Sequence, residues 1–137
     1  MSLRFTVIGD PAPQGSKRHV GHGVMVESSK KVKPWRQSVE AAAVAAKNGA
    51  SALDGPLVLS IVFWLPKPTS LSKKKLALGP CRKPDLSKLI RSTEDALVTA
   101  GAIVDDARIV DLYVQKRYVL ETGHTGADIV VTVKGAA

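Results

Sequence analysis

The sequence predicts one α+β domain over residues 1–137, in which two main helices pack on a single mixed β-sheet. Segments with alternating or continuous apolar residues, typical of strands, occur near both ends and in the middle of the chain. Two segments whose apolar residues recur at helical spacing lie between them. We therefore expect the order strand, hairpin, helix, strand, helix, strand, strand.

The first half of the chain accounts for the first three of these features. Alternation from Leu3 to Ile8 predicts a half-buried strand, and the sequence PAPQGS at 11–16 predicts a loop. Apolar residues on both sides of Gly21–Gly23 predict a hairpin. Pro34 suits the first turn of a helix that continues through an Ala-rich run to Lys47, and Gly49 is expected to end it.

The second half begins with a strongly apolar strand from Leu57 to Leu65, between two prolines. Residues 67–83 contain six Lys or Arg and no acid, so we expect an exposed, basic and mobile loop. A helix follows from about Leu86 to Ala100. The last two strands are expected at 107–118, with Val110, Leu112 and Val114 on one face, and at 127–133 after a turn at 122–126.

The charge distribution favours a polyanionic partner. The net charge is +8, but residues 1–84 hold 14 Lys/Arg and 4 Asp/Glu, whereas residues 85–137 hold 6 and 8. A segregated basic region is typical of nucleic-acid binding, although it can also serve solubility alone. Aromatic residues are only 4% of the chain, so we expect recognition through phosphates rather than stacking on many unpaired bases.

Several functional classes are not expected. No apolar run is long enough to span a bilayer, and the first residues lack the features of a secretory signal. The sequence has no phosphate-binding P-loop and no dinucleotide fingerprint, so no nucleotide cofactor is expected. Cys81 is the single cysteine, which excludes an internal disulfide and favours the reducing cytoplasm.

An acidic window at residues 85–111 contrasts with this basic chain. It holds six carboxylates, Asp85, Glu94, Asp95, Asp105, Asp106 and Asp111, against three basic residues. Carboxylates repel phosphates unless a divalent cation lies between them. Mg²⁺ prefers oxygen ligands and often takes only one or two carboxylates, with water and substrate phosphate completing its shell. This pattern favours metal-dependent phosphodiester hydrolysis.

Helical geometry places some of these residues on one edge. Ser87, Arg91, Glu94 and Asp95 fall on an arc beside the apolar stripe of the second helix, and Asp85 precedes its first turn. Each has a simpler interpretation. Asp85 could be only an N-cap, Asp105 and Asp106 only a turn, and Glu94 and Asp95 solvated residues that pair with Arg91.

These motifs resemble the RusA-type Holliday junction resolvases, a family with many phage and prophage members. The resemblance is carried by KPDLSKLIR at 83–91, EDAL at 94–97 and AGAIVDDARIVD at 100–111. It implies a RusA-like fold and a homodimeric endodeoxyribonuclease that uses Mg²⁺, or plausibly Mn²⁺, to nick opposing strands of four-way DNA junctions. Such an enzyme would act on branched DNA in the bacterial host cytoplasm.

The resemblance also implies roles for individual residues. Asp85 and Asp106 would be the first and last catalytic aspartates, Asp105 would accompany Asp106 as a metal ligand, and Arg91 would take the place of a basic residue that assists at the scissile phosphate. DNA phosphates would be contacted by basic residues outside the acidic window and by one within it. These are Lys17, Arg18, Lys73, Lys74, Lys75, Lys83 and Lys88.

One position departs from the family pattern, because Ser87 stands where the family has its second aspartate. A hydroxyl is neutral and binds Mg²⁺ far less strongly than a carboxylate. Three interpretations follow: Asp85 and Asp106 act with a water held by Ser87, Glu94 or Asp95 substitutes for the missing acid, or the protein binds junctions and cleaves them weakly. We favour a retained but weakened site. A basic accessory domain that binds RNA or protein is a further alternative.

Overall fold

A computed structural model describes residues 1–15, 17–19, 25–27, 30–121 and 123–135. It confirms an α+β fold with one mixed four-stranded sheet. The elements are, in chain order, β1 (Ser2–Ile8), β2 (Lys17–His19), β3 (Met25–Glu27), α1 (Val32–Lys47), β4 (Leu57–Leu65), α2 (Lys73–Leu78), α3 (Leu86–Thr99), the 3-10 helix η1 (Asp106–Arg108), β5 (Ile109–Tyr118) and β6 (Gly126–Val133).

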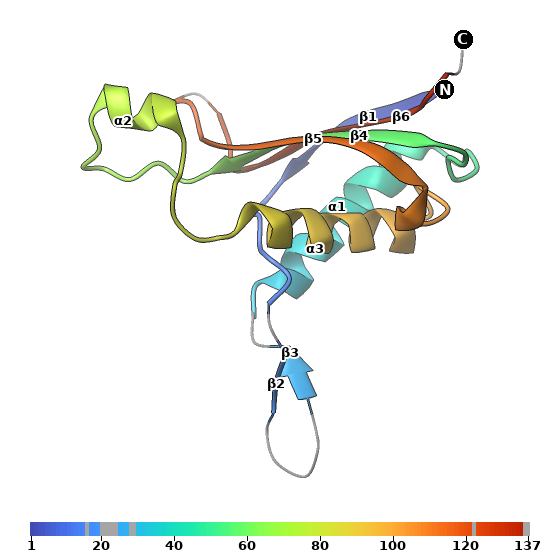
Figure 1. The fold of residues 1–137 in the computed structure, drawn as a ribbon, viewed down its shortest axis with the longest axis horizontal. Helices are drawn as coiled ribbons and strands as arrows, with labels where there is room; N and C mark the ends of the chain where they lie inside the picture. Colours follow the sequence, from blue (N-terminus) through green and yellow to red (C-terminus); the bar gives the residue numbers. More distant parts are fainter. Residues whose placement is uncertain (16, 20–24, 28–29, 122, 136–137) are drawn as a thin grey trace.

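The sheet has the strand order β1-β6-β4-β5, in which β4 and β5 are parallel and the other pairs are antiparallel. Helices α1 and α3 lie together beneath one face of it (Figure 1). Strands β2 and β3 form a separate hairpin that projects away from the sheet, and α2 lies beyond the sheet at the end where β5 finishes (Figure 1). The result is two layers with two projections.

The alternation of β4 determines which face is buried. Five of its residues, from Leu57 to Leu65 at every second position, are buried, and the residues between them are partly exposed. Trp35 of α1 joins the layers, because its ring packs 6.4 Å from that of Phe63 and its indole N–H donates to Thr93 Oγ1 of α3 at 3.1 Å. A buried indole requires such an acceptor, so this contact fixes α1, α3 and the sheet together.

The register of β5 corrects one expectation about its faces. Leu57 pairs with Ile109, whereas Val58 pairs with Asp111, so one residue is inserted at Val110. Such a β-bulge reverses the alternation on the bulged strand. Leu112 and Val114 pair with buried residues of β4 as expected. Val110 has no partner on β4 and is 55% exposed, so it does not lie on one regular face with them.

The loop after β1 is bonded directly to α3. Ser92 Oγ donates to the carbonyl oxygen of Ala12 at 2.7 Å, and the backbone N–H of Gln14 donates to the carbonyl oxygen of Lys88 at 3.0 Å. Ser92 is fully buried, although the apolar pattern of α3 did not single it out. These two bonds hold the base of the β2–β3 hairpin against the first half of α3.

Other expectations differ in detail. The segment 67–83, expected as a loop, contains the short helix α2, whose N-cap Ser72 accepts a bond from the backbone N–H of Lys75. The hairpin strands are present, but the expected turn at 21–23 and residue Thr122 lie outside the described residues. In the part of the chain that the structure describes, no helix has the length and apolar character needed to cross a membrane.

Candidate active site

Asp85 stands at the N-cap position of α3 without acting as a side-chain cap. Its backbone is extended, with φ −67° and ψ 134°, and its carbonyl oxygen accepts bonds from the N–H groups of Lys88 and Leu89. The carboxylate makes no cap hydrogen bond and lies 3.9 Å from Lys88 Nζ. An exposed pair at this distance contributes little stability, so the Asp85 carboxylate is available to other ligands.

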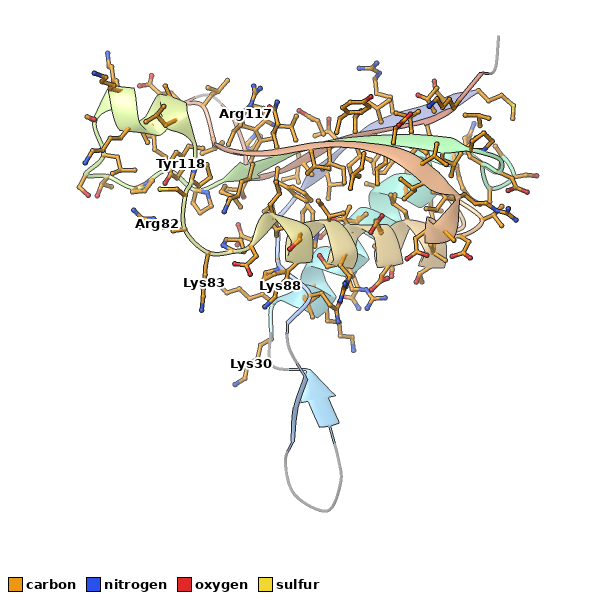
Figure 2. All side chains as sticks on the ribbon, viewed as in Figure 1. Lys30, Arg82, Lys83, Lys88, Arg117 and Tyr118 are labelled. Carbon is orange, nitrogen blue, oxygen red and sulfur yellow. The ribbon has the colours of Figure 1, made fainter. Side chains whose placement is uncertain are left out.

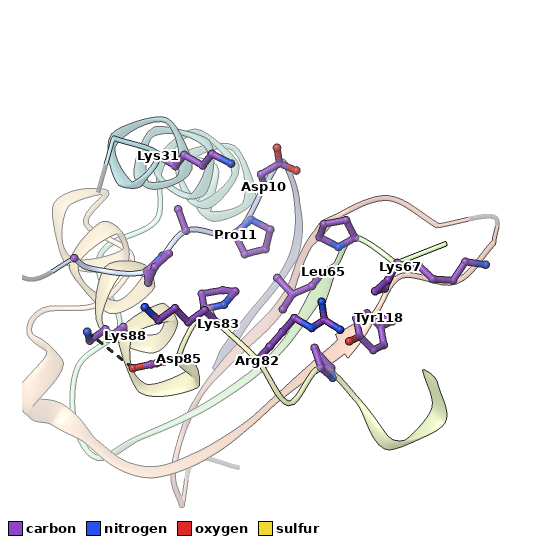
Figure 3. A pocket seen from close by; sticks show the side chains of 17 residues that line it. Asp10, Pro11, Lys31, Leu65, Lys67, Arg82, Lys83, Asp85, Lys88 and Tyr118 are labelled. Carbon is purple, nitrogen blue, oxygen red and sulfur yellow. Dashed lines mark ion pairs between the residues drawn. The ribbon is translucent and has the colours of Figure 1, made fainter. Parts of the chain in front are cut away.

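A groove of about 820 Å³ opens beside Asp85. Its walls come from the loop after β1, the start of α1, the end of β4 and the segment that leads into α3. Figure 3 shows Lys83 and Lys88 on the same side as Asp85, with Lys31 across the groove. The charged residues that line it are Lys31, Lys67, Arg82, Lys83, Lys88, Asp10 and Asp85. Five cations and two anions give the groove a positive field suited to phosphates.

This groove includes two of the predicted DNA contacts and three cations that were not assigned to that role. Lys83 and Lys88 line it as expected, together with Lys31, Lys67 and Arg82. These three belong to basic clusters visible in the sequence, but their convergence depends on the packing of three separate segments. Figure 2 shows Arg82, Lys83 and Lys88 along one side of the molecule, between α2 and the hairpin.

The other predicted DNA contacts lie elsewhere. Lys73, Lys74 and Lys75 are exposed on α2 and are not among the residues that line the groove. Lys17 and Arg18 belong to β2, and their side chains lie outside the described part of the structure. The hairpin and α2 are therefore two separate projections of the molecule (Figure 1), and the sequence of each contains basic residues.

A second feature is a group of carboxyls at the far end of α3. Asp105 caps η1 by accepting a bond from the N–H of Ala107, and its carboxyl shares a hydrogen bond with that of Asp106. This shared bond raises the pKa of Asp106 and lowers that of Asp105. The charge of Asp95 raises the pKa of Asp106 further. Loss of the proton from Asp106 is therefore less favourable than from an isolated aspartate.

Glu94 belongs to the same group and is not the solvated face residue that was one of its interpretations. Its side chain is half-buried, and this burial raises its pKa to about 7, with further increases from the charges of Asp106 and Asp95. Arg91 acts in the opposite direction. The carboxyl groups of Glu94, Asp95, Asp105 and Asp106 therefore interact electrostatically, which sequence spacing alone did not establish.

The raised pKa of Glu94 predicts a pH dependence of stability in the presence of a chelator. The folded protein retains this proton up to about pH 7, whereas the unfolded chain releases it near its ordinary value of 4.5. The folded state therefore binds more protons in this window, and this group's contribution to stability falls as pH rises through it. We expect Glu94→Gln to be more stable than the wild type at pH 8, by about 1 kcal/mol after allowing for the solvated half of the carboxyl.

Urea unfolding at pH 5 and pH 8 tests this expectation. The advantage of Glu94→Gln should be small at pH 5 and larger at pH 8. Glu121→Gln is a suitable control, since Glu121 is exposed and remote from these carboxyls in sequence and fold. A Glu94→Gln variant that is less stable than the wild type at pH 8 would show that Arg91 stabilises the carboxylate more than burial penalises it.

Asp85 and Asp106 are not brought into one metal-binding cluster. Asp85 precedes α3, and Glu94 lies nine residues later, which is about 13 Å along a helix axis. Among the described residues, no group of three or more His, Cys, Asp or Glu side chains is placed to hold one ion. The oxygen donors that are present still suit Mg²⁺, which keeps several waters and needs only one or two carboxylates.

Ser87 and Arg91 lie on the exposed side of α3 between these two acidic positions. Ser87 is exposed in the first turn, where the helix has no acidic residue, and Arg91 is exposed one turn later. His124 and Cys81 are exposed, and His22 lies outside the described residues.

A comparison with known families identifies the family to which this chain belongs. The family model described as endodeoxyribonuclease RusA matches residues 9–132. The chain belongs to the RusA family. A comparison with curated proteins found no match. The match spans the groove, α3 and both acidic positions.

Membership of the RusA family implies a DNA-binding endonuclease that resolves Holliday junctions in recombination. RusA-family resolvases generally depend on a divalent metal. The positive groove agrees with DNA binding, and the carboxyls of Asp85 at its rim and of Asp105 and Asp106 at the far end of α3 are donors of the type that divalent cations prefer. The family match confirms the resemblance drawn from the motifs at 83–111.

Proposed function

We propose that this protein is a Mg²⁺-dependent endonuclease, able to use Mn²⁺, that resolves four-way DNA junctions as a homodimer. One observation carries the proposal. In a RusA-family chain, the exposed Asp85, whose side chain makes no capping hydrogen bond, lies at the rim of a groove lined by five cations. Two copies would present two such sites to opposing strands of one junction. The RusA motifs further suggest a phage or prophage origin and activity in the bacterial cytoplasm.

The cations would bind and orient the DNA. Lys83 and Lys88 lie beside Asp85 and would hold phosphates next to the scissile bond, and Lys31, Lys67 and Arg82 would extend this contact across the groove. Lys17 and Arg18 on the hairpin and Lys73–Lys75 on α2 would contact more distant phosphates. Contacts of this kind position DNA without reading its sequence, as suits recognition of a branched shape.

The carboxylates would supply the metal site. Asp85 makes no capping hydrogen bond, and Asp105 and Asp106 lie at the other end of α3, so each of these two positions offers oxygen donors of the type that a hard cation prefers without the three forming one cluster. Bound Mg²⁺ would lower the pKa of a water nucleophile and neutralise charge on the phosphoryl oxygens. Arg91, one turn from Glu94 on the exposed edge, would stabilise the negative charge that develops on the phosphorane.

Ser87 supports a second candidate function. The chain has a hydroxyl where the family has an aspartate, and no described group of three acids replaces it. A protein of this kind would bind branched DNA through the groove and cleave it weakly or not at all. Binding would still fall steeply with salt, because several phosphate contacts release counterions.

A cleavage assay on a synthetic four-way junction distinguishes the two candidates. The wild type is incubated with Mg²⁺, with Mn²⁺ and with chelator, and binding is measured in parallel. We expect paired nicks in opposing strands with either metal and no product with chelator. Binding without product in both metals would support the binding protein instead. Equal affinity for linear duplex and junction would contradict both, and tighter binding to structured RNA would support the accessory domain.

A further inference from the structure

Lys116 is a half-buried lysine on the helix-facing side of the sheet. It pairs in register with Phe63, which is fully buried, and the matching positions along β5 are occupied by Leu112, Val114 and Tyr118. A lysine at this position of the strand is unusual beside apolar neighbours, and its ammonium group is bonded to nearby backbone. The hydrogen-bond partners of Lys116 therefore indicate its structural role.

Those partners are two backbone carbonyls of the segment that leads into α3. Lys116 Nζ donates to the carbonyl oxygen of Arg82 at 2.7 Å and to that of Pro84 at 2.9 Å. The ion pairs recorded for the described residues do not include Lys116. Hydrogen bonds from a charged donor are stronger than neutral ones, so Lys116 holds this segment on β5 with two of its three N–H groups.

The segment has few other means of being held. Among the described residues, the two bonds from Lys116 are the hydrogen bonds made by residues 80–84. Pro80 and Pro84 have no N–H to donate. Pro84 directly precedes Asp85, whose own carbonyl begins the hydrogen bonding of α3. Arg82 and Lys83, on the same segment, line the groove. Lys116 thus holds the backbone that carries three residues of the groove, Arg82, Lys83 and Asp85.

Lys116 acts from behind the segment and not from within the groove. It is absent from the lining of the groove but lines a second hollow together with α2, Cys81 and Leu86. The segment passes between the two hollows, and Pro80 and Tyr118 border both. A direct contact between Lys116 and substrate phosphate in the groove would need these bonds to break.

We propose that Lys116 is a positioning residue that orients Asp85 towards the substrate and metal by fixing the backbone of Arg82 and Pro84. The catalytic part of this proposal rests on the nuclease function proposed above, whereas the structural part does not. Residues that orient a ligand typically change metal affinity or activity 10- to 100-fold when mutated. An effect of that size is expected here without a comparable loss of DNA binding.

The test compares Lys116→Met with Lys116→Arg, which keeps a charged donor, and with Arg117→Met as a matched control. Arg117 is the exposed neighbour whose side chain lies on the opposite face of β5. For Lys116→Met we expect a cleavage rate about 10- to 100-fold lower and a roughly tenfold higher Mg²⁺ concentration at half-maximal rate. Junction affinity should change less than about threefold, because phosphate attraction tolerates small shifts of long side chains. Lys116→Arg should recover most of the activity, and Arg117→Met should resemble the wild type.

Amide hydrogen exchange provides a readout that is independent of activity. The N–H groups of Lys88 and Leu89 donate to the Asp85 carbonyl, and they should exchange faster in Lys116→Met while core amides of β4 stay protected. Unchanged exchange at these two amides, or an unchanged Mg²⁺ requirement in an active variant, would overturn the proposal. If Lys116→Met does not fold, Lys116→Gln carries the same expectations. If the wild type does not cleave, the nuclease proposal fails, and the exchange result alone decides the role of Lys116.

Discussion

Replacing Asp106 with asparagine is expected to lower junction cleavage at least about 100-fold, an effect typical of removing a group that stabilises charge at a reacting centre. The folded protein should not lose stability. Asp106 already shares a hydrogen bond with Asp105, and its pKa is raised for that reason. An asparagine N–H can donate to the Asp105 carboxylate, so the structure is kept while a negatively charged oxygen ligand is lost.

Three measurements on Asp106→Asn separate catalysis from folding and binding. The rate is measured in single turnover at saturating Mg²⁺, stability by urea unfolding, and affinity by junction titration in chelator. Glu121→Gln is the matched control, since it removes an exposed carboxylate outside the groove and the acidic group. If the wild type and Asp106→Asn cleave at the same rate, the carboxyls at this end of α3 are not part of the active site.

Replacing Ser87 with aspartate is expected to increase cleavage at low Mg²⁺ by at least about tenfold, because a carboxylate restores a ligand of the type that Mg²⁺ prefers. Ser87 is exposed in the first turn of α3, so the longer side chain meets no buried obstacle. The same change should stabilise the protein by about 0.3 to 1 kcal/mol, since an acid in the first turn interacts favourably with the helix dipole. The first turn has no acid at present.

Ser87→Asn is the control for this prediction, because it adds a similar side chain without the charge. Cleavage by both variants is followed across a Mg²⁺ titration, and their stabilities are compared in chelator. A gain in Ser87→Asp alone, from a wild type with little activity, would show that the site has lost one ligand on an intact scaffold. Greater stability without any gain in cleavage would show that the residue at position 87 affects the stability of α3 but not the binding of Mg²⁺ for cleavage.

Much of the fold was predictable because its elements have strong local signals. β4 lies between two prolines and alternates strictly in burial, and α3 keeps its apolar stripe from Leu89 to Leu97. The bulge at Val110 was not predictable, since Ile109 and Val110 are both apolar and only pairing with β4 distinguishes them. Helix α2 was missed because its three lysines dominate the composition of 67–83 and its six residues are too few for a clear period.

The motifs at 83–111 predict which residues form the site, and these roles stay predictions, but the motifs do not give the geometry of the site. The motifs identified Asp85, Asp106 and the basic residue Lys83, and the structure shows that Asp85 is not used as a side-chain cap. What spacing could not supply was tertiary: the burial of Glu94 beside Asp106, and the approach of Lys31 and Lys67 to the groove. Lys116 gave no signal, because a lysine near a strand end is normally a solvated residue.

The bonds between the loop after β1 and α3 give the hairpin a mechanical connection to the active helix. The chain leaves the hairpin towards α1, but on its other side it is tied to the carbonyl of Lys88 and to buried Ser92. If bound DNA displaced the hairpin, these bonds would carry the displacement of its base to Lys88 and Ser92 in the first two turns of α3. The structure thus couples the base of the hairpin to the helix that begins after Asp85.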